Sequence, residues 1–158
     1  MLNGCPDGWL TDPHRRCRCS STQIQRYLSR ISGPLLDRID LHVDVPAVPF
    51  DALTHAPTGE TSAQIRSRVI KAQKWCHKRG QKHANALLSS KELKTHCEMT
   101  SEAVKLLKSA MHELALSARS YTKILKISRT IADLAQSETI QPAHIAAALP
   151  YRRLDRQL

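Results

Sequence analysis

The chain is poor in aromatic side chains. Of its 158 residues only 4% are aromatic, and Phe50 is the one phenylalanine. Sheets draw heavily on aromatic and β-branched residues, so this scarcity disfavours a β-sandwich. The core must then be built from leucine, isoleucine, valine and alanine, which suits packed helices. We therefore expect a mainly α fold.

Long apolar runs are absent as well. No stretch approaches the roughly 18 consecutive apolar residues that a transmembrane helix needs. The N-terminus lacks the charged, apolar and small-residue sections of a signal peptide. We expect a cytoplasmic protein with no membrane partner. In that reducing setting the five cysteines should be thiols or metal ligands rather than disulfides.

The motifs of a complete ATPase are missing too. The sequence contains no Gly-x4-Gly-Lys-Ser/Thr phosphate loop and no apolar strand ending in the paired acids that could hold Mg²⁺. Phosphoryl transfer has no platform without the amide cradle of that loop and the metal. The chain alone should therefore not hydrolyse ATP.

Positive charge is what the chain has in excess. Lysine and arginine number 24 against 14 acidic residues, for a formal charge of +10. This surplus favours anionic partners such as nucleic acid, while a solvated basic face without a partner is the alternative. The candidate nucleic-acid contacts lie in one loop and on one predicted helix face: Arg15, Arg16, Arg18, Lys71, Lys74 and Lys78.

Residues 1–48 combine a loop, a helix and a strand. A cysteine- and arginine-rich loop over residues 1–22 precedes a predicted helix over 23–31 and a break at 32–34. From Ile39 to Val45, apolar and polar residues alternate with a period of two, which is typical of a half-buried strand. A lone strand needs a neighbour, so its sheet must be completed by strands outside this sequence or from another chain.

Residues 49–59 are predicted to form a linker, residues 60–152 a helical domain and residues 153–158 a tail. A serine or threonine that precedes a periodic apolar run can cap a helix, and proline fits the first helical turn. Five helices are predicted in this domain: Thr61 to Arg79, one opened by the capping box Ser89–Glu92 and ending near Cys97, one capped by Thr100 or Ser101, one capped by Ser117, and Ala143 to Leu149 after Pro142.

Four parts of the sequence carry a family resemblance. They are Asn3, the run RISGPLLDRIDLHV at 30–43, the segment CP…DPHRRCRCS at 5–20 and the helix SARSYTKILKISRTIADLA at 117–135. Together they resemble magnesium-chelatase-like AAA+ ATPases, in particular the bacterial competence-protein branch, from Asn3 to about Arg152. The resemblance implies the C-terminal helical lid of a AAA+ protein, preceded by the end of its α/β core.

The resemblance also implies roles for single residues. Asn3 would be the sensor-1 residue that orients the attacking water. Arg38 would be the arginine finger that reaches into the next subunit's site, and Arg119 the sensor-2 arginine at the bound ATP. From the composition alone, a surface arginine paired with Asp37 or Asp40 is the favoured interpretation of Arg38. ATP and Mg²⁺ would be the cofactors of the intact assembly.

The clustered cysteines are candidate metal ligands. Cys5, Cys17 and Cys19 offer three thiolates, and Asp7 or His14 could complete a tetrahedral Zn²⁺ shell. The family resembled usually has four cysteines in this segment, and Asp7 stands where one of them is expected. A loop of reduced thiols without metal is the alternative.

The resemblance implies a function for the intact protein. Family members are hexameric ATPases with an N-terminal Lon-protease-like domain and a nucleotide-binding core, and this branch remodels DNA by branch migration in natural transformation. The partners would be that core, the neighbouring subunits of the ring and DNA. A stand-alone basic module that binds nucleic acid or a protein without catalysis is the alternative. A third, weaker alternative is a motor subunit for metal insertion into porphyrin, which is supported by the family name alone.

Overall fold

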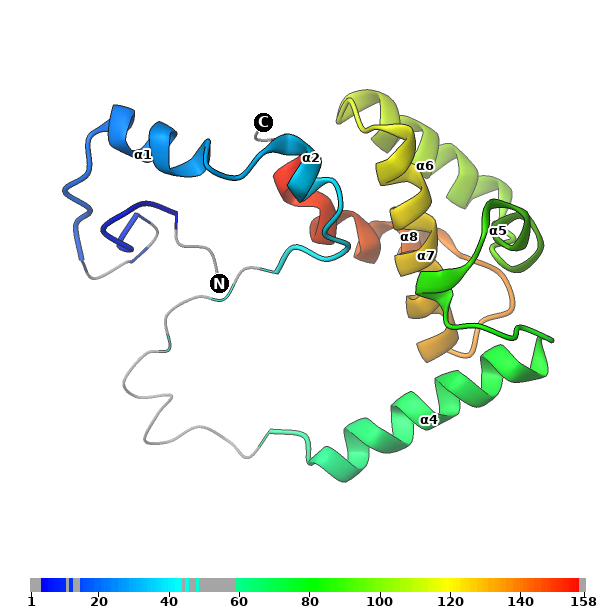
Figure 1. Ribbon diagram of the computed structural model, residues 1–158. Helices are drawn as coiled ribbons and strands as arrows, with labels where there is room; N and C mark the ends of the chain where they lie inside the picture. Colours follow the sequence, from blue (N-terminus) through cyan, green and yellow to red (C-terminus); the bar gives the residue numbers. More distant parts are fainter. Residues whose placement is uncertain are drawn as a thin grey trace. The chain divides into compact units, whose positions relative to one another are not determined.

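The computed structural model describes residues 4–10, 12, 15–43, 45, 48 and 59–156, the last four as backbone only. The chain divides into two compact units. The N-terminal unit comprises Met1–Ile39 with Val43–Gly59, and the helical unit comprises Asp40–His42 with Glu60–Leu158. Figure 1 traces both units by sequence.

The N-terminal unit contains two short helices, α1 (Ser21–Leu28) and α2 (Gly33–Leu36). Ser20 caps α1, because its hydroxyl accepts from the backbone N–H of Gln23 while the Gln23 side chain accepts from that of Ser20. The predicted break lies earlier than residues 32–34, because α1 ends at Leu28 and α2 begins at Gly33. Pro34 lies in the first turn of α2, where a helix does not need the missing N–H.

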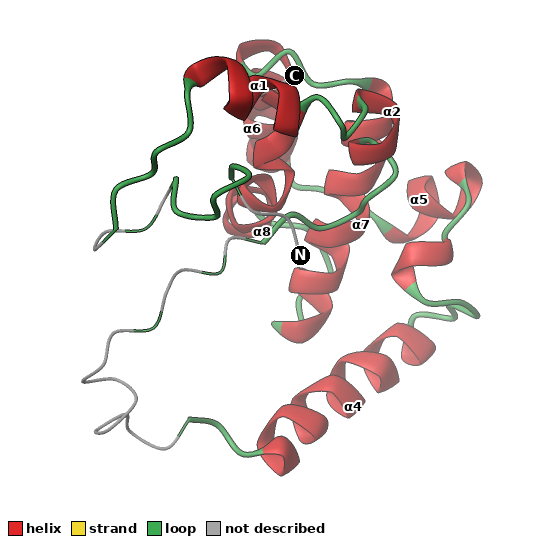
Figure 2. Ribbon diagram, turned by 60° about the vertical axis from the view of Figure 1, so that its left-hand side comes forward, coloured by secondary structure: helices red, strands yellow, loops and turns green. Residues whose placement is uncertain are grey.

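The strand predicted from Ile39 to Val45 is not formed in the described part of that segment. Residues 39–43, 45 and 48 are irregular there, and Figure 2 draws the described chain as helices and loops. Val43 and Val45 are 66% and 68% exposed. The alternating pattern marks residues suited to a sheet, but a strand needs a partner strand to pair its backbone groups.

The helical unit is built around α7. Its elements are α4 (Ser62–Lys78), the 3-10 turn η1 (Asn85–Leu87), α5 (Ser90–His96), α6 (Ser101–Glu113), α7 (Ala118–Leu134), α8 (Pro142–Ala148) and η2 (Leu149–Arg156). Helix α7 packs against α4, α5, α8, η1 and η2, and α6 packs against α8. Figure 1 shows α7 beside α8. The mainly α fold is confirmed.

Aliphatic side chains fill the core of this unit. Ile124, Leu125 and Ala132 of α7 meet Leu107 of α6 and Ile145 of α8, all nearly or fully buried. The expectation of a core without aromatics therefore holds for the described residues. An isolated parallel bridge between Met99 and Ile140 ties the start of α6 to the start of α8.

The predicted helix starts are confirmed. Ser89 and Glu92 form the capping box of α5, Thr100 caps α6 and Ser117 caps α7. Thr61 caps α4 in the same way, through Gln64. In each case the side chain satisfies a backbone N–H that the first helical turn leaves free.

Helix α4 contacts the rest of its unit mainly through its C-terminal end. Ile65 and Val69, two members of the predicted apolar stripe, are each 43% exposed. Ala72 and Cys76, further along the stripe, are half-buried. Within the described ranges, no helix has the length and apolar character that crossing a membrane would require.

Candidate functional site

Arg38 lies in the turn that follows α2. Its backbone N–H donates to the carbonyl of Leu35 at 3.0 Å, and its side chain is exposed. No side chain in the described part of the chain pairs with its guanidinium, and Asp40 instead contacts Lys123 at 2.8 Å. The ion-pair alternative for Arg38 is therefore not what the structure contains.

Arg119 occupies the first turn of α7, two residues after the cap Ser117, and is exposed. The positive end of the helix dipole makes this an unfavourable place for a cation. An exposed arginine here can receive an anion together with the free amides of the first turn. Asn3, the third residue expected at the nucleotide, lies outside the described residues.

The three cysteines of the loop come together. The sulfur atoms of Cys5, Cys17 and Cys19 all lie within 4.8 Å of one another, and those of Cys5 and Cys17 are 3.5 Å apart. Asp7 lies beside them without joining the group, since its carboxylate accepts from the backbone N–H of Arg18 at 3.4 Å. His14 lies outside the described residues. These thiols are the described groups best suited to hold a soft cation.

The thiols of this cluster differ in acidity. Burial raises the pKa of Cys5, but hydrogen bonds from Cys17 and from nearby backbone amides outweigh it and leave that pKa below its ordinary value. The backbone N–H of Cys19 lowers the pKa of Cys17, but burial and the thiols of Cys5 and Cys19 raise it to about 11. Cys5 is therefore a more acidic thiol than Cys17.

A basic hollow lies in the same loop. Its volume is about 530 Å³, and it is lined by Asp7, Trp9, Arg15, Arg16 and Arg18. The guanidinium of Arg15 sits over the ring of Trp9, 4.3 Å from its centroid. The three arginines predicted to contact nucleic acid are thus gathered at one place. Trp9 was not among the predicted contacts, because it lies six or more positions before the arginines.

The three lysines predicted to contact nucleic acid share one face of α4. Lys71, Lys74 and Lys78 recur at intervals of three and four residues and are exposed. The ammonium of Lys78 lies 5.4 Å from the ring centroid of Trp75. They belong to a different unit from the arginines of the loop, so the two basic groups are separate candidates.

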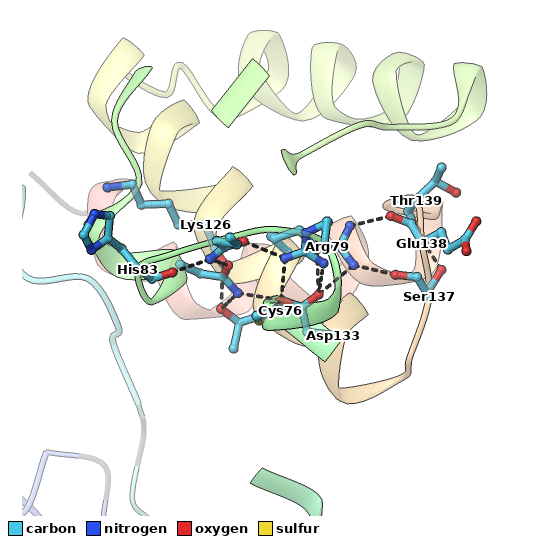
Figure 3. A network of polar contacts seen from close by, with 12 residues as sticks. Cys76, Arg79, His83, Lys126, Asp133, Ser137, Glu138 and Thr139 are labelled. Carbon is cyan, nitrogen blue, oxygen red and sulfur yellow. Dashed lines mark hydrogen bonds and ion pairs between the residues drawn. The ribbon is translucent and has the colours of Figure 1, made fainter. Parts of the chain in front are cut away.

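A buried ionic network joins α4 to α7 (Figure 3). Asp133 is 1% exposed and accepts from Arg79 at 2.6 Å, from Arg129 at 2.9 Å and from Asn85 at 2.8 Å. The thiol of Cys76 donates to the same carboxylate at 3.0 Å. Arg129 is fully buried and also donates to the carbonyls of Ser137 and Glu138. The network fixes the C-terminal end of α4.

One local clue to this network is present in the sequence. Arg129 and Asp133 are four residues apart on one helix, a spacing that brings side chains together. The clue was missed because charged pairs at this spacing usually face solvent. Burial raises the pKa of Asp133, but Arg79, Asn85 and Cys76 outweigh it, so that pKa lies below its ordinary value.

Residues 40–42, which directly follow the Arg38 turn, are held by the helical unit. The Asp40 carboxylate pairs with Lys123 of α7, and the backbone N–H of His42 donates to the carbonyl of Tyr151 at 2.9 Å. The Arg152 guanidinium, 1% exposed, donates to the Asp40 carbonyl at 3.4 Å. A hollow of about 390 Å³ at this junction is lined by Leu41, Lys123, Ile127, Leu134 and Tyr151 among others.

Comparison with known proteins matches both parts of the chain. The family model "Magnesium chelatase, subunit ChlI C-terminal" matches residues 59–152, and "Magnesium chelatase, subunit ChlI" matches residues 1–53. Competence protein ComM of Haemophilus influenzae is 44% identical over 158 residues, covering 99% of this chain and 30% of that protein. The uncharacterized protein YifB of Escherichia coli is 39% identical over 158 residues, covering 99% of this chain and 31% of that protein.

The chain therefore spans about a third of the length of these curated relatives. The C-terminal family model alone covers more than half of the chain, and its range coincides with the helical bundle built around α7. The position of the match, the helical fold and the similarity along almost the whole chain agree: this protein belongs to the magnesium chelatase ChlI family of AAA+ proteins, and its helical unit is the C-terminal domain of that family.

Proposed function

We propose that this chain forms the lid-bearing C-terminal part of a hexameric AAA+ ATPase that couples ATP hydrolysis to the remodelling of DNA. Family membership supports the ATPase assignment, with ATP and Mg²⁺ as cofactors. The name of the Haemophilus relative, a competence protein, supports a role with DNA. The partners are the nucleotide-binding core of the same protein, the neighbouring subunits and DNA.

The observation that carries this proposal is the exposed guanidinium of Arg38, which has no acidic partner among the described residues. An arginine that ends a short helix without an acidic partner is available to a phosphate outside its own unit. In the ring it would contact the γ-phosphate held by the adjacent subunit and stabilise the charge that develops during transfer. Arg119 would contact the nucleotide of its own subunit from the start of α7, and Asn3 would orient the attacking water.

Replacing Arg38 in the intact protein tests the proposal. Arg38→Ala should lower ATP turnover by about 1000-fold, a typical contribution of an arginine finger, while nucleotide affinity stays near that of the wild type. Arg30→Ala is the matched control, because it removes another exposed arginine from the turn after α1. Steady-state hydrolysis and binding of a fluorescent nucleotide are the measurements. Undiminished turnover in Arg38→Ala would rule out the finger.

A second function, a module that binds nucleic acid without catalysis, is favoured by one observation. The loop places three arginines and Trp9 around one hollow, which offers phosphate contacts beside a ring on which a base can stack. The genomic sequence upstream of Met1 separates the two proposals. A phosphate loop in the same reading frame favours the ATPase, and a start codon without such a loop favours the module.

A further inference from the structure

We propose that Cys5, Cys17 and Cys19 bind one zinc ion through their three thiolates, and that Asp7 is a positioning residue rather than a ligand. Each thiol would release its proton to solvent on binding, so the bonds formed are three Zn–S bonds. The inference goes beyond the proposed ATPase role and does not depend on it, because neither the thiols nor their test involves ATP.

The positions of the sulfur atoms fit a tetrahedral zinc ion. With Zn–S bonds of about 2.3 Å, two ligands at the tetrahedral angle lie about 3.8 Å apart. The sulfur atoms of Cys5 and Cys17 are 3.5 Å apart, and all three lie within 4.8 Å of one another. One ion can therefore reach all three thiolates with only small side-chain adjustments. A set of three sulfur donors selects a soft or borderline cation over Mg²⁺ or Ca²⁺.

A turn and one backbone amide support this arrangement. The turn that begins at Cys5 is closed by a hydrogen bond from the Gly8 N–H to the Cys5 carbonyl at 3.1 Å, with Gly8 at φ 79°. The Cys19 N–H donates to the Cys17 sulfur at 3.4 Å. Amide donors of this kind orient metal-bound ligands and stabilise their charge.

Asp7 has a different role. Its carboxylate accepts from the backbone N–H of Arg18, the residue between Cys17 and Cys19, and so holds that segment against the turn at Cys5. None of its oxygen atoms lies within the ligand group of the described residues. We therefore assign three protein ligands from the described loop and leave the fourth position to water or another donor.

The N-terminal unit also has a structural use for a metal. Within its described residues, the buried apolar side chains are Cys5 and Leu36, too few for a hydrophobic core. Small units of this kind commonly depend on a metal for stability. A zinc ion would join the two ends of the segment from Cys5 to Cys19 and so hold in place the loop that carries Trp9 and the arginines.

The test is the metal content of the purified 158-residue chain, prepared with a reductant and without added chelator. We expect elemental mass spectrometry to find one equivalent of zinc per chain. Exchange for Co²⁺ should give intense visible absorption from tetrahedral coordination and a thiolate charge-transfer band. Cys5→Ser should lower zinc affinity by about tenfold or more. Cys76→Ser is the matched control, because it removes a thiol from the helical unit and should keep the full equivalent.

Four results would overturn the proposal. The first is a wild-type chain with reduced thiols and no zinc, and the second is equal zinc in Cys5→Ser and Cys76→Ser. The third is a protein lighter by two hydrogens without metal, which would identify a disulfide between Cys5 and Cys17. The fourth, loss of zinc in Asp7→Ala with helical circular dichroism intact, would make Asp7 a ligand.

Discussion

Asp133 is the residue on which the attachment of α4 depends. Its carboxylate is buried and accepts hydrogen bonds from Arg79, Arg129, Asn85 and Cys76. Burying a charge is costly unless it is paired and fully hydrogen-bonded, and here the partners supply both. Removing the acid would leave the fully buried Arg129 without its counter-ion. The cost of such a change is much larger than that of losing one exposed ion pair.

Asp133→Ala should lower the free energy of unfolding by about 3–5 kcal/mol, because one partner of a buried ion pair is left uncompensated. Urea denaturation followed by circular dichroism measures this. Glu60→Ala is the control, since it removes the exposed pair of Glu60 with Arg68 and should change stability little. Equal losses in the two variants would contradict the structure.

The pH dependence of the same protein gives a second readout of Asp133. Because folding lowers the pKa of this carboxyl, its stabilising contribution is complete above the ordinary value of about 3.9 and is lost as the pH falls through the lower, folded-state value. In Asp133→Asn this part of the acid sensitivity should disappear. Urea midpoints at neutral pH and in the acid range would show it.

At the scale of elements, the segment Asp40–His42 connects two functions. It directly follows the turn of Arg38, and three contacts hold it on the helical unit through Lys123, Tyr151 and Arg152. Lys123 belongs to α7, the helix whose first turn carries Arg119. In the proposed ring, a movement of the helical unit would thus be transmitted through this segment to the residues next to Arg38.

Lys123→Ala should loosen the segment. The amide of His42, which donates to the Tyr151 carbonyl, should exchange its hydrogen faster in the variant, because the ion pair that anchors Asp40 is gone. Hydrogen exchange read by NMR is the measurement. Lys105→Ala, an exposed lysine on α6, serves as the control. If His42 exchanges at the same rate in both variants, the Asp40–Lys123 pair does not hold the segment.

The elements also show what a sequence can predict. Helix starts at Ser89, Thr100 and Ser117 were predicted within a residue, because a cap is a contact between neighbours in the chain. The buried network was not, since Cys76 and Asp133 lie 57 positions apart and only the folded bundle brings them together. The strand prediction after Ile39 was wrong for a related reason. The alternating pattern indicates which side chains share a face, but it does not specify the partner strand.

The candidate sites follow the same division. The grouping of Cys5 with Cys17 and Cys19 could be proposed from their residue type and close spacing, although their geometry could not. Trp9 was missed because its position beside Arg15 depends on how the loop folds. The roles of Arg38 and Arg119 came from family resemblance, and the structure adds the exposure of both side chains.

At the scale of the whole molecule, charge is the property that both units share. The formal charge is +10, and each unit contributes one candidate surface, the loop hollow and the lysine face of α4. A protein that neutralises phosphates releases counter-ions, so its affinity for nucleic acid falls steeply with salt. The slope of log affinity against log salt concentration gives the number of phosphate contacts. Comparing this slope between variants can assign the contacts to one of the two surfaces.

The chain should bind single-stranded DNA at low ionic strength. Replacing Arg15, Arg16 and Arg18 by glutamine should reduce the slope of log affinity against log salt by about 2, at about 0.7 for each lost phosphate contact. The control replaces Lys91, Lys105 and Lys108 by glutamine and removes the same charge from other exposed positions. Fluorescence anisotropy measures both. Equal slopes in the two variants would mean that net charge alone binds the DNA.

The one-sided attachment of α4 has a mechanical consequence. Its 17 residues give a rod about 26 Å long, fixed near Arg79 and exposed along most of its length. A rotation of this helix would therefore be centred near the Arg79–Asp133 pair. A rotation of about 10° around this pair would move the far end of α4 by about 4.5 Å over that length. A small rearrangement around the Asp133 carboxylate would thus displace the far end of the helix by a distance as large as a side chain.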